Sequence, residues 1–284
     1  MKMLDQKGYE FCFEGIVDLE DSSLYVIRTR PLNNSKGRII FLGGSNFDLR
    51  IKKAFLASSI LAEYEFVTYE PRGIHRSSVP DGDWSMSDFS KDAQDLMKWL
   101  GWENVLILGE SFGGMTALHL SIECPEQILA MAISSATPGG AGGSSLSLLP
   151  MLGLEIEEFS RKMLLQQDSR LSELAQQRPD EFEARLNRRI SEDTLFLSVS
   201  GRSGGYEKLL LAREQHDVFD YLPSIKCPCL VIAGEYDLQA PLEHQKVMAG
   251  RLNDAVYMEF QGGHGVLFTC DSAQSYLMDW LHAL

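Results

Sequence analysis

A serine between two glycines, in the segment Gly109-Glu110-Ser111-Phe112-Gly113, is the side chain of this sequence best placed to act as a nucleophile. It follows the apolar run 105–108 and precedes small residues that suit a helix. A serine hydroxyl projects from the top of a sheet only where the chain reverses sharply, and glycines two residues to either side leave room for that turn. The following helix points free N–H groups at the site. The spacing therefore predicts a nucleophilic serine at a strand–turn–helix junction.

A serine hydroxyl is a weak nucleophile until a base takes its proton, and the chain offers six histidines. His264 lies in Gln261-Gly262-Gly263-His264-Gly265, directly after a predicted strand, where the glycines let the backbone bend towards a neighbouring loop. We expect His264 to be the base. The remaining histidines fall in predicted helices, loops or an inserted segment: His75, His119, His216, His244 and His282.

The base in turn needs a carboxylate to orient it. Asp237 ends the segment Gly234-Glu235-Tyr236-Asp237, just after a buried strand, and is the first choice. Glu235 competes with it, and Asp217 is a more distant alternative. With Asp237, the three residues occur in the chain order Ser, Asp, His, which is expected when all three sit on loops of one sheet.

An oxyanion formed by attack of the serine needs backbone N–H donors that are in place beforehand. Phe112, the residue after the nucleophile, should supply one of them. The second should come from the turn Gly43-Gly44-Ser45-Asn46, where both Gly44 and Ser45 are candidates.

The elements that must position these residues alternate between strand and helix patterns, which implies an α/β fold with a mostly parallel sheet and helices on both faces. The first two strands read as an antiparallel hairpin at one edge. We expect strands at 11–17, 24–30, 38–42, 65–69, 105–108, 128–133, 230–233 and 256–260. Helices are expected at 51–62, 88–100, 115–122 and 243–252, with a closing helix to 280.

The stretch 138–220 breaks this rhythm with a glycine-rich start and then charged helical patterns. We interpret it as a helical cap inserted into a core formed by 1–137 and 221–284, because insertions at the carboxyl edge of such sheets lie beside the site. The alternative is an insertion without a role at the site. The Leu, Met and Phe content of the cap indicates a fairly apolar pocket, in which Arg72 and Arg202 are candidate anion ligands.

The charge and composition of the chain limit the classes of molecule that it is expected to bind. The 284 residues include 40 acidic and 26 basic side chains, for a formal charge of −14, which disfavours nucleic acids and anionic membranes. We expect a small-molecule substrate, no cofactor and no metal, since neither H-E-x-x-H nor C-x-x-C occurs. The start of the chain lacks an apolar signal core, no apolar run of about 18 residues exists to span a bilayer, and the five cysteines have no framework spacing. A cytoplasmic protein with reduced thiols is the expectation. Oligomeric state has no sequence signature here.

On these motifs the chain resembles serine-dependent members of the α/β-hydrolase superfamily over nearly its whole length. The segment 109–113 matches the family's nucleophile elbow, Asp237 its acid position and His264 its base position. The loop 70–77 is similar to the family's D-x-R-G-x-G-x-S, with Glu70 for the first Asp and His75 for the second Gly. Gly43-Gly44 stands where many relatives have His-Gly.

Two less specific stretches, 137–140 and 215–230, resemble oxoadipate enol-lactonase-like hydrolases. The resemblance implies hydrolysis of an ester, lactone or thioester through an acyl-enzyme. The same triad also serves carbon–carbon bond hydrolysis of a vinylogous diketone and acyl transfer, and some proteins of this fold act as small-molecule receptors, so these readings stay open.

Overall fold

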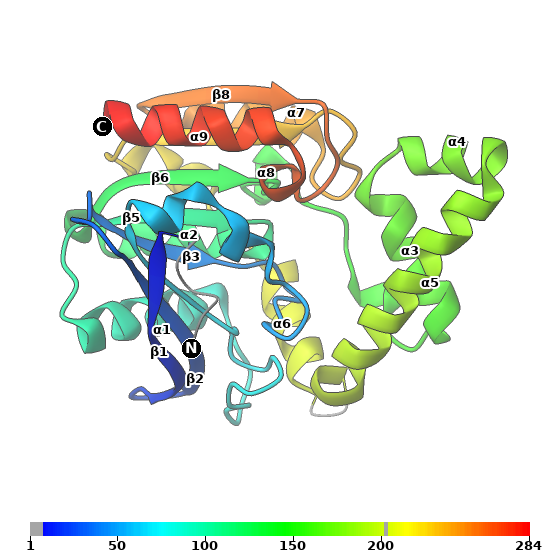
Figure 1. Ribbon diagram of the computed structural model, residues 1–284, viewed down its shortest axis with the longest axis horizontal. Coiled ribbons are helices and arrows are strands. Elements are labelled where there is room, and N and C mark those ends of the chain that lie inside the picture. Colours follow the sequence, from blue (N-terminus) through cyan, green and yellow to red (C-terminus); the bar gives the residue numbers. More distant parts are fainter. Residues whose placement is uncertain (1–7, 202–203) are drawn as a thin grey trace.

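The computed structural model describes residues 8–201 and 204–284, so Arg202 lies outside the described residues. One sheet of eight strands, in the order β1-β2-β4-β3-β5-β6-β7-β8, forms the centre of the molecule (Figure 1). Strand β2 pairs with β1 on one side and with β4 on the other, both in antiparallel fashion, and all other neighbours are parallel. The strands are β1 (Tyr9–Asp18), β2 (Ser23–Pro31), β3 (Arg38–Leu42), β4 (Glu65–Tyr69), β5 (Val105–Glu110), β6 (Ile128–Ser134), β7 (Cys229–Gly234) and β8 (Ala255–Phe260).

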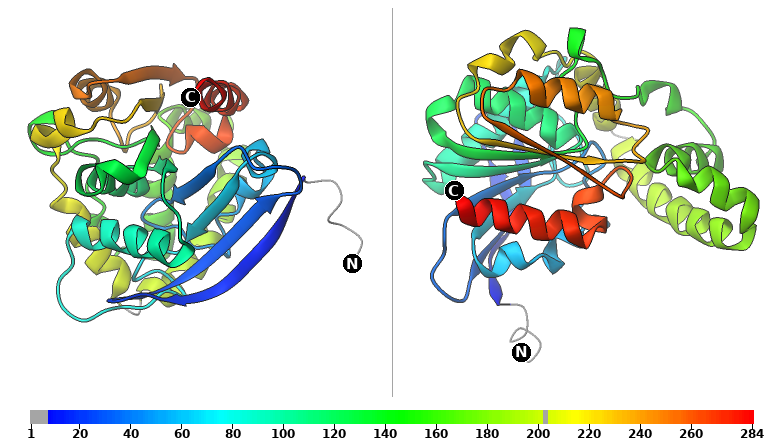
Figure 2. Two further views of the ribbon diagram at one scale, coloured as in Figure 1. Left: turned by 90° about the vertical axis from the view of Figure 1, so that its left-hand side faces the viewer. Right: turned by 90° about the horizontal axis from the view of Figure 1, so that it is seen from above.

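Helices cover both faces of this sheet, which confirms the predicted fold class (Figure 2). Helices α1 (Met86–Leu100), α2 (Phe112–Glu123) and α7 (Leu242–Arg251) pack on one face. The short α8 (Val266–Thr269) and the closing α9 (Asp271–Ala283) pack on the other. Side chains of successive strand residues point to opposite faces, so neighbours such as Ile39 and Ile40 are both fully buried but belong to different halves of the core.

The predicted helix over 51–62 is wrong. The structure has two short 3-10 helices there, η1 (Ala54–Ala57) and η2 (Ser59–Ala62). Ser58 between them is extended, and its hydroxyl accepts a hydrogen bond from the N–H of Ile60. A serine that caps the next turn interrupts the helix that the apolar spacing suggested.

Helix α1, predicted over 88–100, begins two residues earlier, at Met86. The N–H of Ser85 donates to the carboxylate of Asp88 at 2.8 Å, so Asp88 lies inside the helix and Ser85 caps it.

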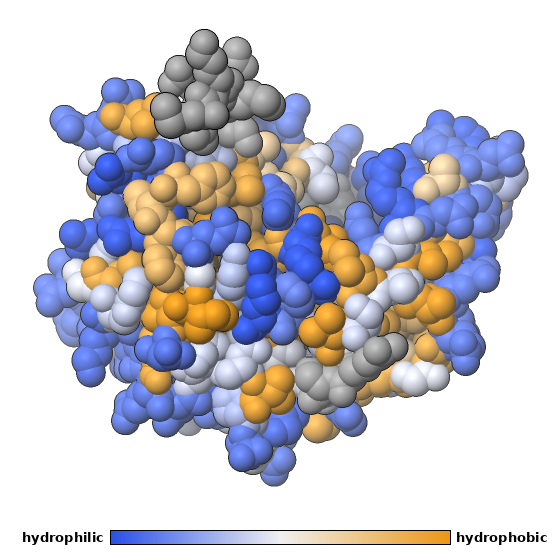
Figure 3. All heavy atoms as spheres, turned by 60° about the horizontal axis from the view of Figure 1, so that its bottom comes forward, coloured by the Kyte–Doolittle hydropathy of each residue, from blue (hydrophilic) through white to orange (hydrophobic). Residues whose placement is uncertain are grey.

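Between β6 and β7 the chain leaves the sheet for a helical segment that projects beyond the carboxyl ends of the parallel strands (Figures 1 and 2). Its helices are α3 (Ile156–Gln167), α4 (Arg170–Gln177), α5 (Pro179–Phe196), a π-helical turn (Leu197–Gly201) and α6 (Gly205–Glu214). We call residues 138–220 the inserted segment. Figure 3 shows hydrophilic residues along the outer edge of its projecting part and hydrophobic residues nearer the body.

The two ends of the inserted segment lie against each other. The N–H of Val218 donates to the carbonyl of Pro138 at 2.9 Å, and Gly139 forms a bridge with Asp217. We call this contact the neck. Within the described part of the chain, no helix is both long enough and apolar enough to cross a membrane.

Candidate active site

Ser111 occupies the turn from β5 into α2, with φ +54° and ψ −117°. This is a backbone conformation that a residue with a side chain rarely adopts. A Cβ on Gly113 would fall against the carbonyl of Leu42, and one on Gly109 would lie 2.7 Å from the Cα of Gly114. Only glycine fits at both positions, so the spacing in the sequence follows from the tightness of the turn.

The structure brings His264 and Asp237 to this serine from the loops after β8 and β7. His264 Nε2 lies 2.9 Å from Ser111 Oγ, and His264 Nδ1 lies 2.9 Å from Asp237 Oδ2. Because an ionised carboxylate only accepts hydrogen bonds, Nδ1 carries the proton in the neutral ring and Nε2 is left to accept from the serine hydroxyl. The three side chains thus form one continuous hydrogen-bonded chain.

Backbone N–H groups hold the Asp237 carboxylate in place. Those of Gln239 and Ala240 donate to its Oδ1 at 2.8 and 3.0 Å, and the side chain is buried. The competing acid Glu235 is exposed to solvent. The third candidate, Asp217, accepts a hydrogen bond from the N–H of Phe219 in the neck.

The other five histidines have partners elsewhere. His216 Nε2 lies 2.9 Å from the carbonyl of Thr137, and its Nδ1 lies 3.2 Å from His119 Nε2. The remaining three contact Glu70, the carbonyl of Ser144 and Glu63: His75, His244 and His282, respectively. Among the six, only His264 contacts Ser111.

Both groups of expected oxyanion donors border the serine. Gly44 and Ser45 line the same cavity as Ser111, and a Cβ on Gly44 would lie 3.7 Å from that of Ser111. Phe112 opens α2, so its N–H has no acceptor within the helix. Both Gly44 and Ser45 therefore remain candidates for the second backbone N–H donor to the oxyanion.

Ser111 and His264 open into a cavity of about 200 Å³ between the sheet and the inserted segment. Six large apolar side chains line it: Phe41, Phe47, Phe55, Leu148, Met163 and Phe268. The expectation of a fairly apolar pocket omitted the polar part of this wall, which includes Lys52, Glu110, Gln167, Arg189 and Gln239. These polar residues come from separate segments that meet only in the folded chain. Only Glu110 could have been found from the sequence, because it lies next to Ser111 in the segment 109–113.

Two of these polar groups have shifted pKa values. Burial raises the pKa of Glu110, and the nearby His264 and Lys52 oppose that shift. Burial lowers the pKa of Lys52, and the neighbouring Arg189 lowers it further. Each shift favours the uncharged form, because little water reaches this wall of the cavity.

Arg72 is not free to bind an anion. Its Nε and Nη2 donate to the two oxygens of Asp92 at 2.7 and 2.8 Å, and the residue is 2% exposed. The expectation that Arg72 is an anion ligand is therefore wrong, because this buried bidentate pair occupies its guanidinium.

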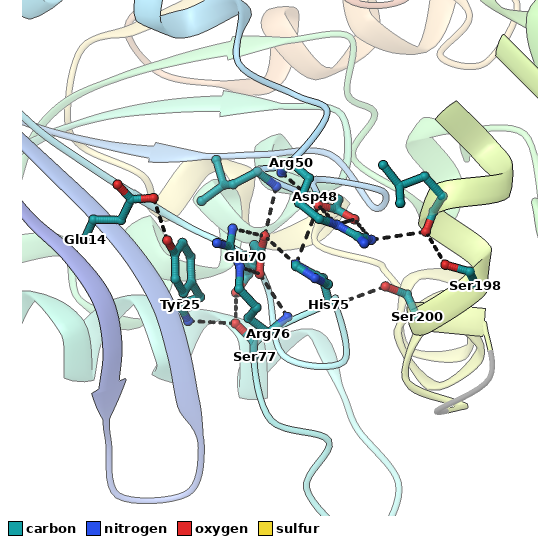
Figure 4. Close-up of polar contacts among 12 residues, drawn as sticks. Glu14, Tyr25, Asp48, Arg50, Glu70, His75, Arg76, Ser77, Ser198 and Ser200 are labelled. Atoms are coloured by element: carbon teal, nitrogen blue, oxygen red, sulfur yellow. Dashed lines mark hydrogen bonds and ion pairs between the residues drawn. The ribbon is translucent and has the colours of Figure 1, made fainter. Parts of the chain in front are cut away.

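The two departures from the family's 70–77 pattern contact each other (Figure 4). His75 Nδ1 lies 3.2 Å from Glu70 Oε1, and Arg76 Nη2 donates to the same oxygen at 2.7 Å. Asp48 also lies near His75, and the three residues would suit a cation by their spacing. However, Arg50 pairs with Asp48 and Arg76 with Glu70, so guanidinium groups already balance both carboxylates.

The inserted segment is hydrogen-bonded to both loops that follow β7 and β8. The N–H of His264 donates to the carbonyl of Gln167, the last residue of α3, at 2.6 Å. The N–H of Ser169 donates to the carbonyl of Tyr236 at 2.9 Å. The end of α3 therefore contacts the backbone next to the candidate acid and at the candidate base.

Comparison with known proteins agrees with this architecture. The family model described as alpha/beta hydrolase fold matches residues 41–270. The chain is 30% identical over 199 residues to the serine hydrolase BPHL of Mus musculus, an alignment that covers 67% of this chain and 61% of that protein. It is 29% identical over 218 residues to a 2-hydroxy-6-oxo-6-phenylhexa-2,4-dienoate hydrolase of Comamonas testosteroni, covering 72% of this chain and 71% of that one.

Among solved structures, the enol-lactonase from Burkholderia xenovorans LB400 superposes with a TM-score of 0.77. The superposition covers 94% of this chain and 99% of the enol-lactonase at 19% sequence identity, so it shows a shared fold alone.

Proposed function

This chain belongs to the alpha/beta hydrolase fold family, and on that premise we propose that it is a serine hydrolase that cleaves an ester, lactone or thioester of a small molecule. One observation carries the proposal. Ser111, His264 and Asp237 are linked by two contacts of 2.9 Å, and the serine opens into a cavity of about 200 Å³. A cavity below the roughly 300 Å³ of common ligand sites suits a short acyl group.

In the proposed acylation, His264 Nε2 takes the proton of Ser111 while Oγ forms a bond to the substrate's carbonyl carbon. The carbonyl electrons move to oxygen, and the N–H groups of Phe112 and of Gly44 or Ser45 bind that oxyanion. As the carbonyl reforms, the bond to the leaving group breaks, and the leaving group takes the proton from His264. Asp237 stabilises the imidazolium throughout.

In the proposed deacylation, a water molecule gives its proton to His264 and attacks the acyl carbon. The bond to Ser111 then breaks, Oγ recovers the proton, and the acid product leaves. Protein side chains and water supply every proton and electron pair in this scheme, so the reaction requires neither a cofactor nor a metal.

We further propose that residues 138–220 act as a cap over a hydrolase core of 1–137 and 221–284. The support is that Leu148, Met163 and Arg189 of this segment line the cavity that contains Ser111. A segment in this position limits the size of the substrate and the access of water to the acyl-enzyme.

A second candidate is hydrolysis of a carbon–carbon bond by the same residues. The observation that favours it is the similarity to the Comamonas testosteroni dienoate hydrolase, which covers 72% of this chain. A receptor role without turnover is a further outcome that the same experiment distinguishes. Acyl transfer differs in that a nucleophile other than water takes the acyl group, so repeating the ester assay with an added alcohol or amine distinguishes it.

The test combines a fluorophosphonate probe with a panel of p-nitrophenyl esters of graded chain length, extended to lactones, thioesters and a vinylogous diketone. We expect the probe to label Ser111 and the wild type to turn over short esters, with Ser111→Ala reducing kcat at least about a thousandfold. Labelling without turnover of any compound would indicate a receptor. If the Ser111→Ala variant hydrolysed the esters with the same kcat as the wild type, the assignment of Ser111 as the nucleophile would be refuted.

A further inference from the structure

The wall of the cavity that contains Ser111 also carries a lysine, Lys52, without an acidic partner among the described residues. Lys52 lines the cavity together with Ser111, and no carboxylate of residues 8–201 and 204–284 forms an ion pair or hydrogen bond with its ammonium group. Other lysines have acidic partners: Lys91, for example, contacts Glu20, Asp21 and Asp95. An unpaired cation in a partly desolvated site is costly unless a ligand completes it.

Two basic side chains near Lys52's end of the cavity, Lys52 itself and Arg189, line it, and most of the carboxyl groups around Lys52 do not. Three carboxyl groups act on Lys52 from longer range: Glu110, Glu192 and Asp193. Glu192 and Asp193 do not line the cavity, whereas Lys52 and Arg189 do. Asp193 is already bound to Arg189 Nε at 2.7 Å.

Glu110 is the one carboxyl group in the cavity wall beside Lys52. Burial raises its pKa, which favours the uncharged acid. Burial also lowers the pKa of Lys52, so its ammonium form requires a negative charge beside it. A neutral Glu110 does not supply that charge, whereas a bound carboxylate would.

The backbone around Lys52 is fixed rather than adaptable. Its N–H donates to the carbonyl of Asp48 at 2.8 Å, which closes one turn. The Asp48 carboxylate is buried and pairs with Arg50, and Arg50 Nη2 also donates to the carbonyl of Leu195 in α5 (Figure 4). This network connects the core to the inserted segment and holds the start of the Lys52 side chain at the border between them.

We propose that Lys52 is a specificity residue that binds a carboxylate on the acyl part of the substrate, so that the preferred substrates are short monoesters, lactones or thioesters of dicarboxylic acids. The inference rests on the proposed hydrolase function of Ser111. The whole molecule carries −14 formal charge and repels anions at long range, so an anionic substrate requires a local cation such as this one.

The test uses two esters of the same shape, monoethyl succinate and ethyl levulinate, which differ in a carboxylate against a methyl ketone. Ethanol release gives kcat/KM for each. We expect the wild type to prefer monoethyl succinate. Lys52→Met, which keeps the length of the side chain, should lower the ratio of kcat/KM for the charged over the neutral ester by about 10- to 100-fold, the usual worth of a hydrogen bond to a charged group.

Lys53→Met is the matched control, because Lys53 is the adjacent lysine and is exposed to solvent. It should leave the ratio unchanged, and Lys52→Arg should retain most of it. A ratio that Lys52→Met does not change, or a wild type that prefers ethyl levulinate, would overturn the inference while leaving the hydrolase function intact.

A binding measurement separates failure of the inference from failure of the proposed function. Succinate should raise the Tm of the wild type and of Lys53→Met but not of Lys52→Met. If neither ester is hydrolysed while succinate still shows this Lys52-dependent effect, the carboxylate site stands and the proposed hydrolysis of these esters fails. If neither ester is hydrolysed and succinate has no such effect, the carboxylate site is refuted.

Discussion

Ser111 holds a strained backbone because its side chain must project from the turn between β5 and α2. A conformation with φ +54° and ψ −117° costs a residue with a Cβ about 1–3 kcal/mol. Glycine adopts it freely but loses about 0.5–1 kcal/mol through the greater freedom of the unfolded chain. Strain at this one residue is therefore measurable as stability.

We predict that Ser111→Gly is more stable than Ser111→Ala by about 1 kcal/mol, although both variants lack activity. The alanine variant keeps the Cβ and hence the strain, so the pair separates strain from loss of the hydroxyl. Urea unfolding of the two proteins gives the difference. Equal free energies of unfolding would show that the backbone conformation at position 111 does not destabilise the folded protein.

The acid can be tested against its neighbour two residues earlier. Asp237→Asn should lower kcat by a factor of about 10³ or more, because an amide favours the wrong imidazole tautomer and offers no charge to the imidazolium. Glu235→Gln should change kcat by roughly tenfold or less, since Glu235 is exposed. Steady-state kinetics of the two purified variants decide the matter. Reversed effects would make Glu235 the orienting carboxylate.

At the scale of elements, the neck that joins the inserted segment to the core depends on a glycine. Gly139 has φ +74°, and a Cβ there would collide with the carbonyl of His216 on the opposite strand of the neck. Gly153 has a similar φ of +85° but has nothing near its missing Cβ. The two positions therefore share the conformational cost and differ in the collision.

We predict that Gly139→Ala destabilises the protein by at least about 2 kcal/mol, whereas Gly153→Ala costs about 1 kcal/mol from the backbone angle alone. Thermal unfolding of both variants, followed by circular dichroism, compares them directly. If Gly153→Ala lowers the Tm as much as Gly139→Ala does, close packing in the neck contributes nothing to stability.

Much of the fold and of the candidate site could be predicted because their signals are local. Ser111 is marked by its flanking glycines, and Asp237 and His264 each follow a strand directly. By contrast, Lys52 and Arg189 lie on different segments and meet at the cavity only through tertiary packing. The helix over 51–62 was wrong because one residue, Ser58, uses its hydroxyl to cap a new turn, and apolar spacing does not register such competition.

At the scale of the whole molecule, a buried histidine couples stability to pH. His216 lies under the neck, where burial above all, and then the nearby His119, lowers its pKa to about 3. The unfolded chain takes up a proton on this ring below about pH 6.5, and the folded chain does not. The contribution of this group is therefore fully present above about pH 6.5 and is lost as the pH falls towards about 3.

We predict that the free energy of unfolding falls with decreasing pH in this window, with His216 supplying up to about 1.4 kcal/mol per pH unit. His216→Gln retains an N–H for the carbonyl of Thr137 and should reduce the slope by that amount. Urea titrations at several values between pH 7 and pH 4 give the slopes. The partly exposed His244→Gln is the control and should leave the slope unaltered, whereas equal slopes in wild type and His216→Gln would contradict the assignment.

The hydrogen bond from His264 to Gln167 couples the position of the inserted segment to the position of the candidate base. The backbone of the candidate base is bound at 2.6 Å to the last residue of α3, and Tyr236 is bound by Ser169 two residues further along. If the inserted segment swings outward to admit a molecule, these bonds break, and the imidazole loses part of its support. Substrate entry and catalysis would then require different conformations. The open conformation admits the substrate but positions His264 poorly, and the closed conformation positions His264 around a bound substrate.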